Sequence, residues 1–302
     1  MFEATGHIRA NVGLETPDDI SAALEAAGRA RQQSRQAGSI ARIRIYDTIE
    51  PRASLWTLLF GGTAADIIAA EFAAAVNDPQ VSGILLDIDS PGGSVYGIPE
   101  LARQIRAARG IKPILAAITE GASAAYYLAS QADQVSTTPS GQVGSIGVIY
   151  VHTDLTGMAD AQGAKFTIFR SQDRKADINP YETLTPEAAS DIQAKVDAYD
   201  AMFVNDVAAG RGVTADKVRA DYGQGRMLLA ADALAAGLID RIETIDEAIA
   251  RLAGGGVPAR QAAKAESLET GPIELSAERL ARSWQLAKWR IPALAGATPG
   301  GK

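Results

Sequence analysis

The chain has 302 residues, of which 47% are hydrophobic and 22% are charged, so it is long enough and apolar enough to bury a sizeable core. Its net charge of −7 gives no reason to expect a nucleic-acid partner. The sequence contains no cysteine, which excludes thiolate nucleophiles, disulfides and cysteine-ligated metals. It has only two histidines, so a histidine-built metal site is nearly excluded as well.

Apolar stretches are too short or too interrupted to predict a membrane span. Residues 1–36 lack the apolar region of a secretory signal. The longest uncharged stretch, 134–153, is broken by proline and glycine, and the apolar run at 53–65 is shorter than a bilayer requires. We therefore expect a cytoplasmic protein without a membrane span.

The predicted elements begin with a helix that starts at the Thr-Pro-Asp-Asp stretch of residues 16–19 and forms a helical N-terminal arm over 1–38. From residue 39 onward, strands alternate with helices, which is typical of βαβ units and a mainly parallel sheet. The expected order is a strand at 40–46, a helix at 63–76, a strand at 81–88, a helix at 98–108, a strand at 112–119, a helix at 122–131, strands at 134–138 and 145–152, a helix at 155–162, a strand at 165–170, helices at 186–209, 214–222 and 230–236, a strand at 238–243 and a helix at 245–252.

The C-terminal part begins with three glycines at 254–256 followed by Pro258, which is typical of a linker. We expect a main domain over 39–252 and a linker with a basic tail over 253–302, in which residues 275–289 are compatible with an amphipathic helix. An apolar cluster at 55–60 is expected to form either an interface or groove wall, or part of the core.

Four short motifs could carry chemistry, although each also has an ordinary structural explanation. The Ser-Pro-Gly-Gly stretch at 90–93 follows a buried strand, and such glycines leave backbone amides free as donors. Ser123 stands among alanines where a helix begins. Two glycines flank Ser145, and Lys175 belongs to a charged loop after a predicted strand.

A nucleophilic serine needs a base, and this sequence offers few. Cysteine is absent and histidine is scarce, so a lysine is the natural candidate. Pairs of serine and lysine are a known variant of the serine-protease triad. The order and spacing of the motifs together therefore favour a serine nucleophile with a lysine base over four unrelated turns.

The order S-P-G-G, A-S-A-A-Y-Y, G-S-I-G-V-I and S-x-x-x-K-x-x-x-x-P resembles the Ser/Lys serine peptidases of the signal peptide peptidase A family. The resemblance covers about residues 40–252 and includes Gly225-Arg226 and Gly237-Leu238-Ile239-Asp240. It implies a Clp-protease/crotonase-like α/β fold with repeated ββα-type units, and a chemistry that requires no metal or cofactor.

The resemblance assigns a role to five residues. Ser123 corresponds to the nucleophile, Lys175 to the general base, and Ser145 to the serine that orients the lysine. The amides of Gly93 and Ala124 correspond to the oxyanion hole. The family usually has Ser-Gly-Gly at the nucleophile, whereas this chain has Ser-Ala-Ala, so we expect activity with less backbone freedom.

A lysine can act as a base near neutrality only if its amine loses a proton easily. A free lysine has a pKa of about 10.4, and burial is the usual means of lowering it. We therefore expect Lys175 to be buried and within hydrogen-bonding reach of Ser123 in the assembled site.

The resemblance implies a polypeptide substrate, and the sequence best matches the phage and prophage branch, whose members process capsid or scaffold proteins within a prohead. We also expect a homo-oligomer, as is usual for this fold. The alternatives are a signal-peptide peptidase that degrades membrane or leader peptides, a Ser-His peptidase that uses His152, a crotonase-like acyl-CoA enzyme, and an inactive assembly protein.

Overall fold

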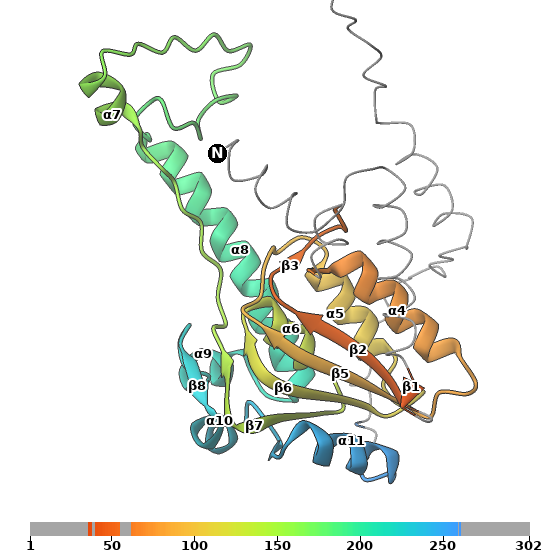
Figure 1. Ribbon diagram of the computed structural model, residues 1–302. Coiled ribbons are helices and arrows are strands. Elements are labelled where there is room, and N and C mark those ends of the chain that lie inside the picture. Colours follow the sequence, from red (N-terminus) through yellow and green to blue (C-terminus); the bar gives the residue numbers. More distant parts are fainter. Residues whose placement is uncertain (1–35, 38–39, 55–61, 259, 261–302) are drawn as a thin grey trace, which may run out of the picture. The chain divides into compact units, whose positions relative to one another are not determined.

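The computed structural model describes residues 36–37, 40–54, 62–258 and 260 (Figure 1). These residues belong to one structural unit that ends at Ala263, and a second unit, residues 264–302, is not described. The predicted arm helix at 16–36, the apolar cluster at 55–60 and the tail helix at 275–289 lie outside the described residues, apart from Gln36.

A seven-stranded, mainly parallel sheet forms the centre of the described unit. Its order is β1-β2-β5-β6-β7-β8, and β9 pairs with β7 beside β8. The pairs β2–β5, β5–β6, β6–β7 and β7–β9 are parallel, whereas β1 and β8 pair antiparallel with their neighbours. The bounds are β1 (Gln36–Ala37), β2 (Ile40–Tyr46), β5 (Gly83–Ser90), β6 (Ile114–Ala122), β7 (Gln134–Gly144), β8 (Met227–Leu229) and β9 (Arg241–Ile242). This arrangement confirms the predicted α/β class with a mainly parallel sheet.

Helices α4 (Ala65–Asn77), α5 (Ile98–Ala107) and α6 (Ala124–Ala129) connect successive parallel strands, and they pack with the sheet in the larger of two hydrophobic clusters. Because side chains alternate along a strand, the other face is covered separately, by α11 (Ile245–Ala253). Figure 1 shows α11 across the sheet from α4 and α5. The larger cluster includes Ile43, Ile45, Leu86, Ile68, Phe72, Leu101 and Tyr126, and the smaller one includes Ile40, Leu85, Leu115, Ala248 and Leu252.

Packing continues beyond α11 and past the glycines that the sequence suggested as a linker. Val257 is buried in the smaller cluster, and the Arg260 N–H donates to Asp133 Oδ1 at 2.7 Å. Burial raises the pKa of Asp133 despite the hydrogen bonds that it accepts from the Ile114 and Arg260 amides. The chain therefore contributes to the main body at least as far as Arg260.

The long helix α8 (Pro186–Arg211) begins at a well-formed cap, in which the Thr185 hydroxyl accepts from the Ala188 N–H at 3.2 Å and proline occupies the first turn. Apart from Ala188, its buried residues lie between Phe203 and Arg211, so its C-terminal half packs against the body. Figure 1 places α7 (Thr156–Ala161) near the N-terminal end of α8. No helix in the described ranges is both long and apolar enough to cross a bilayer.

The predicted strands at 145–152 and 165–170 are wrong. Both lie in the segment that connects β7 to α8, which we call the connecting segment (residues 145–185), and neither pairs with another strand in the described structure. The apolar alternation that suggested strands leaves side chains exposed instead, with 89% of Ile149 and 94% of Phe169 accessible.

Three short strands and two further helices complete the unit. The two-residue strands β3 (Ile49–Glu50) and β4 (Thr63–Ala64) pair in parallel, and β8 adds an antiparallel edge to β7. Sequence periodicity did not reveal them because two or three residues are too few to establish alternation. Helices α9 (Ala215–Asp221) and α10 (Ala230–Ala236) agree with their predicted ranges to within one residue.

An ion pair joins the end of α8 to the chain that enters β9. The guanidinium of Arg211, whose side chain is 3% exposed, donates to both carboxylate oxygens of Asp240 at 2.8 and 2.9 Å. The Val135 N–H also donates to Asp240, at 2.8 Å. Burial raises the pKa of Asp240, but the hydrogen bonds and charge of Arg211 outweigh it and hold the pKa below its ordinary value.

We predict that Asp240→Asn lowers the free energy of unfolding at pH 7 by about 2–4 kcal/mol, because it leaves the Arg211 charge buried without a partner. The contribution of a carboxyl with a depressed pKa is present above its unfolded pKa of about 3.9 and is lost as pH falls through the folded value. Urea unfolding at several pH values measures this. The difference in unfolding free energy between wild type and Asp240→Asn should shrink below about pH 4. A difference that does not change with pH would contradict the contribution assigned to the ionised Asp240 carboxylate.

Candidate active site

Ser123 lies at the sharp turn where β6 ends and α6 begins. Its backbone adopts φ 50° and ψ −121°, a conformation that side-chain-bearing residues avoid. The surrounding structure holds it there: the Ser123 N–H donates to the Gly144 carbonyl at 2.8 Å, and the Ser123 carbonyl accepts from the Tyr127 N–H at 2.9 Å. Such strain is found most often at functional sites, where neighbouring structure offsets it.

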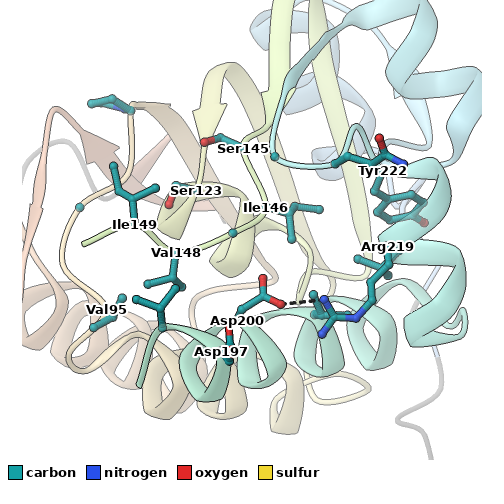
Figure 2. Close-up of a pocket in the computed structure, with 18 residues that line it drawn as sticks. Val95, Ser123, Ser145, Ile146, Val148, Ile149, Asp197, Asp200, Arg219 and Tyr222 are labelled. Atoms are coloured by element: carbon teal, nitrogen blue, oxygen red, sulfur yellow. Dashed lines mark hydrogen bonds and ion pairs between the residues drawn. The ribbon is translucent and has the colours of Figure 1, made fainter. Parts of the chain in front are cut away.

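Ser145 lies beside Ser123 because of the register between β6 and β7. Ala122 pairs with Gly144, so each serine is the first residue after a paired strand end. Ser145 also has a positive φ of 52°, and its N–H donates to the Arg226 carbonyl at 3.0 Å. Figure 2 shows both serines on the same side of one pocket.

The glycine loop after β5 lies against the turn at Ser123. A Cβ on Gly92 would lie 2.9 Å from the Ser123 Cβ and 3.0 Å from the Ala124 nitrogen, and the φ of Gly92 is +95°. The Ile49 N–H donates to the Gly92 carbonyl at 2.8 Å, and the Ser94 N–H donates to the Ile49 carbonyl at 3.0 Å. This pattern directs the Gly93 amide away from Ile49.

Two backbone donors are therefore available beside Ser123. Within the described part of the chain, neither the Gly93 N–H nor the Ala124 N–H has a hydrogen-bond acceptor. Ala124 is the first residue of α6, where helix geometry leaves the amide unsatisfied. A pair of free amides next to a hydroxyl is the arrangement that stabilises an oxyanion.

The pocket that contains both serines has a volume of about 720 Å³. It opens between the strand ends, the start of the connecting segment, and helices α8 and α9 (Figure 2). The residues that line it are Pro91, Gly93, Val95, Ser123, Ser145, Ile146, Gly147, Val148, Ile149, Val196, Asp197, Asp200, Val204, Val218, Arg219, Tyr222, Gln224 and Gly225.

A smaller apolar recess adjoins Ser123 and Ala124. Its walls include Val95, Val148 and the aromatic rings of Tyr127, Tyr199 and Phe203. The rings of Tyr127 and Phe203 stack with their centroids 4.4 Å apart. The Tyr127 hydroxyl donates to Asp206 of α8 at 2.6 Å, and burial, together with that hydrogen bond, raises the pKa of Tyr127. The first turn of α6 is thus fastened to α8.

Lys175 is not brought to Ser123 within a single chain. It is exposed, and it lines a different pocket, of about 410 Å³, against the N-terminal half of α8. The neighbouring Arg174 holds this loop on α8 through ion pairs with Asp177, at 2.8 Å, and with Asp191. Hydrogen bonding to Asp177 and the charge of Asp191 raise the pKa of Arg174. The expectation that Lys175 is buried is therefore wrong for the isolated chain, because Arg174 fastens its loop away from the sheet.

His152 is also absent from the residues that line the pocket of Ser123. It is half-buried in the connecting segment, and its Nε2 atom has no hydrogen-bond partner among the described residues. Neither Lys175 nor His152 therefore lies where it could act as a base for Ser123 within a single chain. In the described ranges, no group of three or more histidine or acidic side chains is arranged to hold a metal.

Asp197, Asp200 and Arg219 line the pocket but were not singled out from the sequence. They lie on helices far from the serine motifs along the chain, and charged residues at helical spacing usually mark a solvated face. Only the fold brings them to the site. The one available signal was the spacing of Val196, Asp200 and Val204, which repeats every four residues on one face of α8.

Comparisons with known proteins agree on one family. The profile described as Peptidase family S49 matches residues 106–256. Capsid assembly protease C of Escherichia phage lambda is 33% identical over 211 residues, which are 70% of this chain and 48% of the phage protein. Head-tail preconnector protein GP5 of Enterobacteria phage P21 is 32% identical over 244 residues, which are 78% of this chain and 48% of that protein.

A protein of Enterococcus faecium that is named as a signal peptide peptidase, SppA, is 32% identical over 175 residues, which are 57% of this chain and 50% of that protein. The chain therefore spans about half the length of these three relatives.

We predict that the Ser123→Gly variant unfolds at a higher urea concentration than the Ser123→Ala variant. Glycine relieves the strain of a positive φ, whereas alanine retains the Cβ that causes it, and the expected difference is about 1 kcal/mol after the entropy cost of glycine. Urea unfolding of the two variants measures this difference. Equal stabilities would show that the turn at Ser123 is not strained.

Proposed function

This chain belongs to peptidase family S49, and on that basis we propose that it is a serine peptidase that hydrolyses peptide bonds through an acyl-enzyme on Ser123. The observation that carries the proposal is the hydroxyl of a strained serine beside two free amides, at the edge of a pocket large enough for a peptide. The family also agrees with the Clp/crotonase-like fold that the motifs implied.

In the proposed reaction, the Ser123 Oγ attacks the carbonyl carbon of a peptide bond as a neutral amine of Lys175 takes its proton. The amides of Gly93 and Ala124 donate to the oxyanion, and loss of one such donor typically lowers the rate by about 10²–10³-fold. The protonated lysine gives its proton to the leaving amine. Water then attacks the ester carbonyl as the lysine takes its proton. The lysine returns that proton to the departing Ser123 Oγ, which releases the carboxylic acid product and regenerates the serine hydroxyl and the neutral amine.

The lysine in this scheme comes from a second copy of the chain. In one chain the Lys175 loop is held at Asp191, whereas Tyr199 and Phe203 of α8 line the recess beside Ser123. These two residues lie about 12 and 18 Å from Asp191 along the axis of α8, and an extended lysine side chain covers at most about half of that distance. A neighbouring subunit therefore supplies Lys175, and Ser145 orients its amine.

The connecting segment has the surface expected of a subunit contact. Its exposed apolar side chains include Ile149, Val151 and Phe169, which are 89%, 78% and 94% accessible. Within the described residues, no amide from Ile146 to Asp154 donates a backbone hydrogen bond, and this stretch pairs with no strand, so its backbone is free to pair with another chain. We therefore propose a closed homo-oligomer in which the connecting segments lie between subunits.

We predict that Ser123→Ala and Lys175→Ala are each inactive on a denatured protein substrate such as casein, and that mixing them restores activity. In a closed ring, each site takes its serine from one subunit and its lysine from the next, so random equimolar assembly should recover about a quarter of wild-type activity. Subunits are mixed in denaturant and refolded together, and peptide release is measured.

Each variant refolded alone is the control, and His152→Ala separates the alternative base. Retained activity in Lys175→Ala would remove the dyad, and loss of activity in His152→Ala alone would favour the Ser-His mechanism. Inactive single variants with no recovery on mixing would instead place both groups in one subunit after a loop closure.

For the substrate we propose phage capsid or scaffold proteins, cleaved in the cytoplasm within a prohead. The support is that the two relatives named for phage head assembly match more of this chain than the Enterococcus faecium relative does. Degradation of leader peptides is the second candidate, supported by that third relative.

We predict that the wild-type protein, incubated with phage capsid and scaffold proteins, produces discrete new termini that are absent with Ser123→Ala. Mass spectrometry of the products identifies them. Cleavage of signal peptides in preference to both head proteins would overturn the phage assignment without affecting the peptidase chemistry.

A further inference from the structure

The side of the pocket that faces the two serines is formed by α8. Val196, Asp197, Asp200 and Val204 line it from one helix face, and Arg219 of α9 lies beside them. Figure 2 shows the side chains of Asp197 and Asp200 across the pocket from Ser123 and Ser145. A peptide bound at Ser123 therefore places one of its side chains toward these carboxylates.

The two carboxylates differ in their partners. Asp200 accepts from the Arg219 guanidinium at 2.7 Å, which neutralises its charge. Asp197 accepts from the neutral Gln193 amide at 2.7 Å, and no cation is paired with it in the described part of the chain. This end of the pocket thus carries a net charge of about −1, located on Asp197.

The walls on the way to Asp197 are apolar. Val148 lies between Ser123 and α8 in Figure 2, and Val95 and Val196 also line the pocket. A lysine or arginine side chain matches such a path, because its methylene stem packs on apolar groups while its charged head reaches a carboxylate. An acidic side chain would meet like charge in the same place.

We propose that Asp197 is a specificity-determining residue that selects a lysine or arginine side chain in the polypeptide substrate, close to the bond that is cleaved. This inference rests on the proposed peptidase activity. It adds a preference that neither the family nor the names of the relatives assigns, namely substrate segments with a basic residue at one fixed position.

The test begins with a proteome-derived peptide library, whose cleavage sites are read by mass spectrometry. Lysine and arginine should be enriched at one position near the cleaved bond. A fluorogenic peptide is then built on the best-cut sequence, with lysine, norleucine, glutamine or glutamate at that position. Norleucine keeps the aliphatic stem and removes the charge, so the comparison isolates the carboxylate.

Lysine should be preferred to norleucine by about five- to tenfold in kcat/KM, a preference that rising salt should weaken because Asp197 is exposed. Asp197→Asn should abolish the preference, and Asp197→Lys should invert it toward glutamate. The matched control is Asp221→Asn on α9, an exposed aspartate that pairs with Lys217 at 2.7 Å outside this pocket. It should leave the preference unchanged.

The possible failures are distinguishable. If wild type cleaves no peptide and no protein, the proposed peptidase activity itself fails. If cleavage occurs without a basic preference, or if Asp197→Asn leaves the preference intact, only the role of Asp197 is overturned. If Asp197→Asn dissociates the oligomer and the preference of the remaining assembled fraction is unchanged, Asp197 is a subunit contact and the inference is equally overturned.

Discussion

The parallel pairing between β6 and β7 determines where the candidate site forms. Because Ala122 pairs with Gly144, the two strands end together and their next residues, Ser123 and Ser145, leave the sheet side by side. Both then turn with a positive φ, which requires support from other parts of the fold. A shift of this register by one residue would exchange the faces of β7 and separate the serines. The glycine loop at 90–93 and the residues of α8 that line the pocket both lie at this edge of the sheet.

The division of the proposed chemistry between rigid and exposed parts has a functional consequence. The proposed nucleophile and oxyanion donors are held by strands and helices that pack in the buried core, whereas Lys175 belongs to an exposed segment held by surface ion pairs of Arg174. In the proposed mechanism, a monomer therefore lacks its base, and peptide hydrolysis begins only when subunits assemble. Such an arrangement restricts a broad hydrolytic activity to the assembled state.

Sequence reasoning located the elements of the main sheet because buried strands and amphipathic helices of this length leave clear periodicities. The resemblance of the motifs to a known family implied that Ser123, Ser145, Gly93 and Ala124 share one site, and the structure brings these residues together at neighbouring strand ends. It failed for the connecting segment, where apolar alternation at 145–152 and 165–170 suggested strands. That alternation pairs with no strand among the described residues, and periodicity alone does not show whether a partner strand exists.

The carboxylates on α8 were missed for another reason. Asp197 and Asp200 look like any charged residues on a long helix until the fold brings them opposite the serines. The burial expected of Lys175 was a chemical requirement of the mechanism rather than a property of its local sequence. Lys175 is exposed in the described chain, and we propose that assembly of subunits buries it.

Crosslinking between positions 123 and 175 tests the central claim most directly. The natural sequence has no cysteine, so a Ser123→Cys, Lys175→Cys double variant carries only the two thiols of interest. A short thiol-to-thiol crosslinker should join subunits into a ladder of covalent oligomers on a denaturing gel, and neither single variant should form it. A double variant that assembles normally and yields only uncrosslinked chains would contradict the account.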